Sequence, residues 1–184
     1  VAHPSDLSGR IEAPGSKSHM QRLLAAGLLA RGESWIRRPA DAADCMAAAE
    51  VAAGLGAEIE IGQDALRIRG GLAPRTDVLH MGESGLGIRL FSPIAALAST
   101  PLTLMAIGTL KTRPMQPMAD ALAALGTRTE LQNGCPPIGL HGPLRGGQAS
   151  ADGSLSSQFL TGLLMALRWA PADSALRPAE LKSK

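Results

Sequence analysis

The chain has 184 residues and a formal net charge of +2, a length that suits one sizeable domain or two small ones. It contains two Phe, two Trp and no Tyr, so it lacks the aromatic platform that stacks single-stranded nucleic acid. No block of Lys and Arg tracks a phosphate backbone, and we expect no nucleic-acid partner.

The first predicted unit runs from Gly15 to Gly70. A Gly/Ser loop opens a helix with an apolar face at helical spacing, and Ser34–Arg37 follows as a short strand. We expect Asp41 to cap a second, Ala-rich helix, with Asp44 in its first turn and an end near Leu55–Gly56. Two segments of alternating polarity then predict a hairpin.

The second predicted unit repeats this order about seventy residues later. Gly82–Gly85 opens a helix, Leu102–Ile107 is a strand, and Pro114 and Pro117 fit the first turn of the next helix. That helix ends at Leu125–Gly126, a Leu–Gly pair like the one that ends its counterpart. A hairpin with an Asn–Gly turn closes the unit.

A third unit begins at Asp152–Ser154 with another apolar helix and is cut off at Lys184. The repeated order is strand, helix, strand, helix, hairpin. Because the helices are more apolar than the strands, we predict an inside-out α/β fold. Its repeated βαβαββ units would place the helices inside and amphipathic sheets outside.

Several functional classes lack support in the sequence. Cys45 and Cys135 belong to no CxxC pair and the four His residues are scattered, so we expect no disulfide, metal site or cofactor and a reducing compartment, the cytoplasm. The start lacks the pattern of a signal peptide. The uncharged run Leu90–Leu110 contains Pro93 and Pro101, which favours a buried helix and strand over a membrane span.

Three helix starts combine Gly and Ser with nearby cations, in the segments PGSKSHMQR, GESGLGIR and GSLSSQ. A helix start offers unpaired N–H groups and the positive end of the helix dipole, and glycine lets an anion reach the backbone. Lys17, Arg22 and Arg89 lie in these segments, while Lys111 and Arg113 precede the Pro114 helix. Packed around one axis, these starts would converge on a polyanionic ligand.

Each feature taken alone has a simpler explanation. A Gly/Ser start is commonly a helix cap. Arg89 alone would be a solvated or paired arginine, Lys111 a solvent-facing cation, and Ser156–Gln158 a polar first turn. Because the Gly/Ser pattern recurs three times with cations nearby, we give the ligand-binding hypothesis the same weight as these structural explanations. The sequence has no nucleophile motif, phosphate loop or dinucleotide fingerprint.

The segments that carry these features resemble the signatures of the EPSP synthase family, the 3-phosphoshikimate 1-carboxyvinyltransferases. The similar segments are Pro14–Ser18 with Arg22, Gly82–Arg89, Arg113–Met115, Asp152–Met165 and Leu181–Lys184. They follow the family's order and span essentially the whole chain. Complete members are more than twice as long, so the resemblance is to the amino-terminal part.

The resemblance implies two similar domains, each of three repeats with helices inside. Residues 1–13 would be an opening strand and hinge segment related to the second domain, which lies outside this chain. Residues 14–184 would be the amino-terminal domain with its third repeat incomplete. That second domain would be a partner of this one.

The resemblance also implies a reaction, the transfer of the enolpyruvyl group of phosphoenolpyruvate to shikimate 3-phosphate in aromatic amino-acid biosynthesis. Lys17 and Arg113 would hold phosphoenolpyruvate beside the backbone of Gly85, Arg89 would support this loop, and Gln158 would touch both substrates. Glyphosate would be an inhibitor. The groups that transfer protons would lie in the second domain, so we expect no catalytic residue here and no activity from the isolated chain.

The resemblance implies that this chain carries mainly the shikimate 3-phosphate half of the site, and this substrate would contact the remaining motif residues. Ser18 and Arg22 would hold its ring and carboxylate, and three serines would hold its phosphate, namely Ser156, Ser157 and Ser183.

The second signature departs from the family pattern at three positions. Glu83 replaces an asparagine, Leu86 a threonine and Leu90 a proline. These changes bear on the phosphoenolpyruvate side of the site and on sensitivity to glyphosate.

Two alternatives stay open. The first is the sister enzyme that acts on UDP-N-acetylglucosamine, which shares the fold. That enzyme has a loop cysteine, and it has Lys-Asn in the first motif where this chain has Lys17–Ser18. The Ser-Ser-Gln segment of this chain favours shikimate. The other alternative is a domain that binds anions without catalysis.

Overall fold

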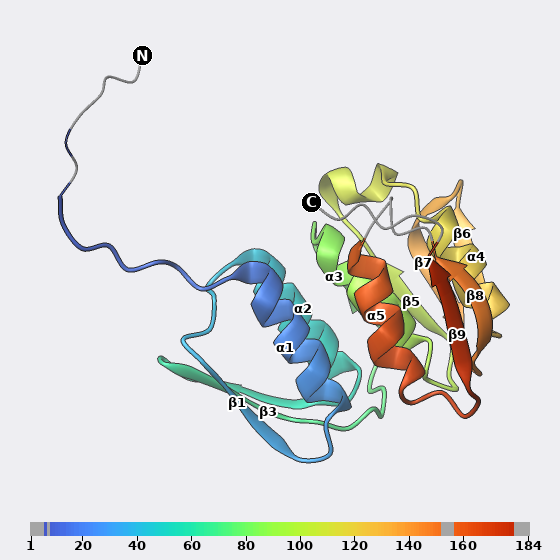
Figure 1. Ribbon diagram of the computed structural model, residues 1–184, viewed down its shortest axis with the longest axis horizontal. Helices are drawn as coiled ribbons and strands as arrows, with labels where there is room; N and C mark the ends of the chain where they lie inside the picture. Colours follow the sequence, from blue (N-terminus) through green and yellow to red (C-terminus); the bar gives the residue numbers. More distant parts are fainter. Residues whose placement is uncertain (1–5, 7, 152–156, 179–184) are drawn as a thin grey trace.

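Three units of similar order follow one another in the computed structural model, which describes residues 6, 8–151 and 157–178 (Figure 1). The first unit comprises α1 (Lys17–Leu29), β1 (Glu33–Arg37), α2 (Ala43–Gly54), β2 (Glu58–Ile61) and β3 (Ala65–Arg69). The second comprises β4 (Val78–His80), α3 (Gly85–Ala95), β5 (Leu102–Met105), the 3-10 helix η1 (Gly108–Thr112), α4 (Gln116–Ala124), β6 (Arg128–Gln132) and β7 (Cys135–His141). The described part of the third comprises β8 (Gly147–Ala151), α5 (Ser157–Leu167) and β9 (Ser174–Pro178).

The strand pairing shows that the units are copies of one another. One sheet has the order β1-β3-β2 and is antiparallel, and the second has the order β4-β5-β7-β6 with only β4 and β5 parallel. The third pair, β8 with β9, is parallel like β4 with β5. Because β1-β3-β2 matches β5-β7-β6 in order and direction, the predicted repeat is confirmed.

The ends of the second helices match in detail as well. Leu55 and Leu125 are the C-caps of α2 and α4, and the glycines that follow have φ values of +121° and +92°. In each unit the capping leucine carbonyl accepts a hydrogen bond of 2.9 Å from the segment beyond the hairpin. These positive φ values favour glycine, and they confirm both predicted helix ends.

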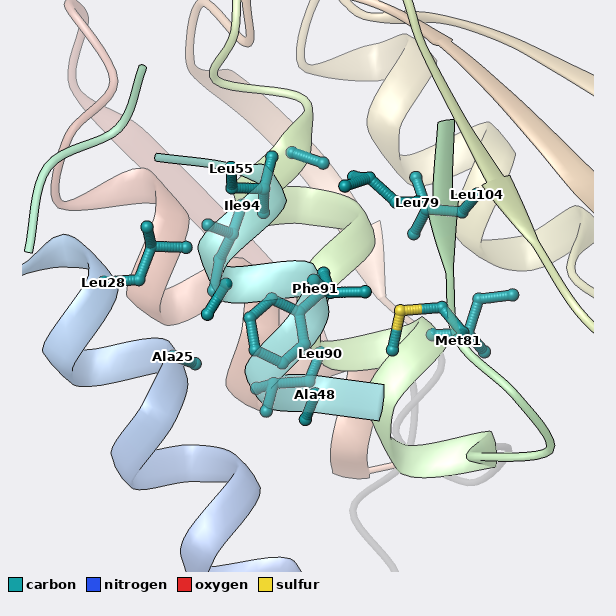
Figure 2. Close-up of a cluster of buried hydrophobic side chains, with 14 of the residues drawn as sticks. Ala25, Leu28, Ala48, Leu55, Leu79, Met81, Leu90, Phe91, Ile94 and Leu104 are labelled. Carbon is teal, nitrogen blue, oxygen red and sulfur yellow. The ribbon is translucent and has the colours of Figure 1, made fainter. Parts of the chain in front are cut away.

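The core is built from helices, with sheets outside them. Figure 1 shows the sheet of β1 and β3 along one side of α1 and α2, with α3 and α5 in the middle of the molecule. Phe91, Leu90 and Ile94 on α3 are fully buried, and Figure 2 shows side chains of α1, α2, β4 and β5 around them. This arrangement confirms the predicted inside-out α/β fold.

Three local predictions were wrong. Ala42, not Asp41, is the N-cap of α2, and it makes no side-chain cap bond. Pro114 precedes α4, although Pro117 does lie in its first turn. Strand β5 ends at Met105 because the chain then leaves the sheet, and the N–H of Ile107 donates to Gly82 in the neighbouring loop instead.

The opening segment has no helix or strand in its described residues, 6 and 8–13. Its Glu12 carboxylate forms an ion pair with Arg38, which follows β1. The prediction that residues 1–13 pair with a second domain stays a prediction.

Candidate functional site

The first helices of the three units run in the same direction, so their starts share one end of the molecule. The Ser84 hydroxyl at the start of α3 donates a 2.9 Å hydrogen bond to Gln21 in α1, and Gly162 in α5 packs on the backbone of Arg89 in α3. The opposite ends of all three helices line one apolar cavity of about 340 Å³, through Leu29, Leu97 and Trp169 among others. The Gly/Ser segments of α1 and α3 and the first residues of α5 therefore lie at the same end.

The first start holds two of the predicted cations. Ser16 caps α1 by accepting from the N–H of His19. Lys17 lies at the first position of α1, where its ammonium forms a 2.7 Å ion pair with Asp44 of α2. Arg22, one turn further, donates to the carbonyl of the exposed Ser18 at 2.9 Å. Asp44 was predicted only as a residue of the first helical turn, so its contact with Lys17 is new.

The ion pair has a measurable consequence for the titration of Lys17. The hydrogen bond and the charge of Asp44 raise the pKa of Lys17 above its ordinary value of about 10.4. We predict that Asp44→Asn lowers this pKa, as followed by NMR titration of the lysine side chain. Because the folded-state pKa is raised, the stabilisation by the pair is present below about pH 10.4 and is lost as pH rises through the raised pKa.

Asp41→Asn is the matched control, because Asp41 lies three residues away and forms no ion pair within the described residues. Equal Lys17 pKa values in the Asp44→Asn variant and in the unchanged chain would contradict the ion pair.

At the second helix start, that of α3, two arginines contact one glycine, Gly85. Arg113 follows η1 and its guanidinium lies against Gly85, so that a Cβ added there would be 2.6 Å from the Arg113 Nη1. Arg89 donates to the Gly85 carbonyl at 2.9 Å. Any side chain at position 85 would displace Arg113, because the available space is already filled. The same η1 carries Lys111, which instead lines a separate hollow with Cys135 and Pro136.

The charges of this second start are not balanced by carboxylates. Burial lowers the pKa of Arg89, and the neighbouring charge of Arg113 lowers it further. Among the ion pairs of the described residues, none involves Arg89 or Arg113. Two adjacent guanidiniums without a counter-ion favour an anionic ligand, which would relieve their mutual repulsion.

The three departures in the second signature are accommodated locally. Glu83 turns its carboxylate to Gly108 and the N–H of Thr109, at 3.4 Å, and pairs with no arginine in the described part of the chain. Leu86 and Leu90 are buried in the helical core. The substitutions therefore leave the Gly85–Arg113 contact in place.

The third start is described only from Ser157 onward. Ser157 and Gln158 are the first two residues of α5, and the carbonyl of Ser157 accepts from the Thr161 hydroxyl at 3.0 Å. Since α5 lies alongside α3, these residues are at the same end of the molecule as Gly85. The predicted contacts Ser156 and Ser183 lie outside the described residues.

The described residues contain neither a metal-binding cluster nor a membrane-spanning helix. In the part of the chain that the structure describes, no three His, Cys, Asp or Glu residues are grouped to hold a metal ion. No described helix has the length and apolar character needed to cross a membrane. Cys45 and Cys135 are free thiols.

The comparisons with known proteins agree with the geometry. The family model described as EPSP synthase (3-phosphoshikimate 1-carboxyvinyltransferase) matches residues 1–180. A 3-phosphoshikimate 1-carboxyvinyltransferase of Aeropyrum pernix is 38% identical over 166 residues, which cover 90% of this chain and 39% of that protein. The corresponding protein of Methanosphaerula palustris is 39% identical over 188 residues, covering 97% and 43%.

Solved structures show the same relationship. An EPSP synthase from Acinetobacter baumannii superposes with a TM-score of 0.82 at 27% identity, covering 96% of this chain and 41% of that one. The enolpyruvyl transferase NikO from Streptomyces tendae shares the fold, with a TM-score of 0.60 at 18% identity over 89% of this chain and 39% of its own. The chain spans about two fifths of the length of the curated relatives it matches.

Proposed function

Because the chain belongs to the EPSP synthase family, we propose that the enzyme containing it transfers the enolpyruvyl group of phosphoenolpyruvate to shikimate 3-phosphate. The observation that carries this proposal is the contact of Arg113 with Gly85 beside Arg89, because two guanidiniums without a carboxylate partner suit a phosphate or carboxylate ligand. The proposal covers the phosphoenolpyruvate half and the shikimate 3-phosphate half of the site.

In the phosphoenolpyruvate half, Lys17 and Arg113 hold the anionic groups, Gly85 forms the backbone wall, and Arg89 supports that wall. The hydrogen bond from Arg89 to the Gly85 carbonyl supports this last role. Lys17 is held near the site by Asp44 and stays more than half exposed, so an anion can reach its ammonium. Gln158 lies at the start of α5, within reach of both substrates in the proposal.

In the shikimate 3-phosphate half, Ser18 and Arg22 contact the ring and carboxylate, and the α5 start with Ser156 and Ser157 takes the phosphate, together with Ser183. A helix start suits a phosphate because its N–H groups are unpaired and the helix dipole favours negative charge. A hydroxyl of shikimate 3-phosphate gives up its proton as its oxygen bonds to C2 of phosphoenolpyruvate, while C3 gains a proton and becomes a methyl group. Loss of phosphate from C2 and of one proton from that methyl group then restores the double bond.

The proton-transfer groups belong, in this proposal, to a second domain that closes on the cleft and contributes further cations. Residues 1–13 form the strand and hinge that connect to it, and residues 14–184 form the amino-terminal domain. Glyphosate would compete for the phosphoenolpyruvate half, and the enzyme would work in the cytoplasm.

The first test is selective binding. We expect calorimetry to show that the chain binds shikimate 3-phosphate at least tenfold more tightly than shikimate, since one charge-assisted hydrogen bond contributes about 1.5–3 kcal/mol. Equal affinities would contradict the phosphate site at α5. Titration with UDP-N-acetylglucosamine separates the sister activity, because preferential binding of that ligand would favour the alternative.

A second test addresses Arg22. We expect Arg22→Ala to weaken shikimate 3-phosphate binding about tenfold or more, while the melting temperature changes by no more than a few degrees. Within the described residues, the Arg22 side chain donates one hydrogen bond, to a carbonyl one turn away in its own helix. Arg75→Ala is the matched control, because Arg75 likewise donates to a single carbonyl, that of Gly56, away from the helix starts. Unchanged affinity with a large melting shift would assign Arg22 a structural role.

A further inference from the structure

A buried hydrogen bond joins the first two helix starts, and neither of its side chains belongs to the proposed substrate contacts. The Ser84 hydroxyl donates to the Gln21 Oε1 at 2.9 Å across 63 residues of sequence. Both residues are 1% exposed. Since they come from different repeats, the bond joins two units where both loops meet the candidate site.

Ser84 is fixed from both sides, which makes it a rigid end for this bond. Its hydroxyl also accepts from the N–H of Gly87 at 3.0 Å, so it caps α3 while it donates to Gln21. Gly87 leaves the room for this arrangement, because an added Cβ would lie 2.9 Å from the Ser84 Oγ. Rotation of the hydroxyl would break one bond or the other.

The bond lies beside the groups that would hold phosphoenolpyruvate. Ser84 directly precedes Gly85, whose backbone faces Arg113. Gln21 lies one helical turn beyond Lys17 on α1, and residues i and i+4 share one helix face. A shift of α1 against α3 would therefore change the separation between the Lys17 ammonium and the Gly85–Arg113 wall.

We propose that Gln21 and Ser84 are positioning residues for phosphoenolpyruvate, because their hydrogen bond sets the register of the two loops that this substrate bridges. The inference rests on the proposed function and adds two residues to that site. Neither residue touches the substrate. Both act through Lys17 on one loop and Gly85 with Arg113 on the other.

The test compares Gln21→Leu, Ser84→Ala and the double variant with the unchanged chain. Gln21→Leu removes the bond between helices and keeps the cap of α3, so it separates positioning from capping. Ser92→Ala is the matched control, because Ser92 is a fully buried serine of α3 whose hydroxyl donates only within its own helix, to Ile88. Each variant of the 184-residue chain is titrated with phosphoenolpyruvate and, separately, with shikimate 3-phosphate, and amide NMR shifts report weak binding.

We expect Gln21→Leu and Ser84→Ala each to weaken phosphoenolpyruvate about fivefold to tenfold, as loss of a hydrogen bond of about 1–1.4 kcal/mol would do. The double variant should be no weaker than the worse single one, because both changes remove the same bond. Affinity for shikimate 3-phosphate should change less than twofold in Gln21→Leu, and Ser92→Ala should retain both affinities.

Unchanged phosphoenolpyruvate affinity in Gln21→Leu would overturn the positioning role and leave the proposed function intact, as would equal losses for both ligands. A lack of any phosphoenolpyruvate response in the unchanged chain would overturn the positioning role, and a lack of response to both substrates would overturn the proposed function as well. Fully additive losses in the double variant would show that the two side chains act separately.

Discussion

The isolated 184-residue chain is expected to release no detectable phosphate from phosphoenolpyruvate and shikimate 3-phosphate. Positioning two reactants together can lower a barrier by roughly 7–11 kcal/mol, which corresponds to about 10⁵–10⁸ in rate. In the proposed site, half a cleft would leave phosphoenolpyruvate against Arg113 and Lys17 with water on its other side. Electrostatic stabilisation is weak in a wet site, so substrate binding can persist while turnover is lost.

The measurement is a phosphate-release assay with the chain alone, and again after adding the other part of a relative's enzyme as a separate chain. Activity should appear only in the mixture, and Arg113→Ala in this chain should abolish it while Arg75→Ala should not. Turnover by the isolated chain would contradict the division of the site between two domains. An inactive mixture whose parts bind each other and both substrates would favour the alternative of a binding domain without catalysis.

Replacement of Gly162 by Val is expected to cost about 3 kcal/mol in the free energy of unfolding. A Cβ at this position would lie 2.6 Å from the Leu90 carbonyl oxygen and 2.9 Å from that of Arg89. Both atoms belong to the backbone of α3, so the two helices must separate. Overpacking of this kind costs about 1–3 kcal/mol, and a chain of this size should lose about 6–12 °C in melting temperature.

The Gly162→Ala variant tests whether a smaller side chain at this position stabilises or destabilises the chain. In an open helix position, alanine would stabilise the chain by about 0.5–1 kcal/mol, whereas the close approach predicts destabilisation. Leu164→Val is the control for a β-branched residue in α5, because Leu164 is 60% exposed. The melting temperatures of all three variants are measured by thermal unfolding. A higher melting temperature for Gly162→Ala would contradict the close packing of α3 and α5.

The local pattern of the sequence was enough to predict the repeat and most elements within it. Helical spacing of apolar residues predicted α1 and α5, the repeated order of elements predicted α3, and the Leu–Gly pairs predicted two helix ends, because the spacing and capping signals depend on residues only a few positions apart. The cap at Asp41 failed for a related reason. Asp is a preferred capping residue, yet the helix begins two residues later, and it is Asp44 that meets a cation, Lys17, 27 residues earlier in the chain.

The candidate site was predictable as a set of residues but not as an arrangement. Motifs identified Lys17, Gly85, Arg89 and Arg113 because each belongs to a short segment with a recognisable pattern. The pairing of Gln21 with Ser84 carried no such signal, since a glutamine in a helix and a serine in a loop are ordinary residues. The nearest signal was the helical position of Gln21, one turn beyond Lys17.

The sequence by itself therefore determined the order of elements, the repeat and the chemical types of the candidate ligands, through interactions that are short in sequence. Only the tertiary structure decided that Asp44 pairs with Lys17, that Arg113 packs on Gly85, and that a buried hydrogen bond joins two helix starts. These contacts span 27 to 63 residues of chain. The first two depend on how helices and loops pack within one repeat, and the third depends on how two repeats pack against each other. Local propensity holds no information about either kind of packing.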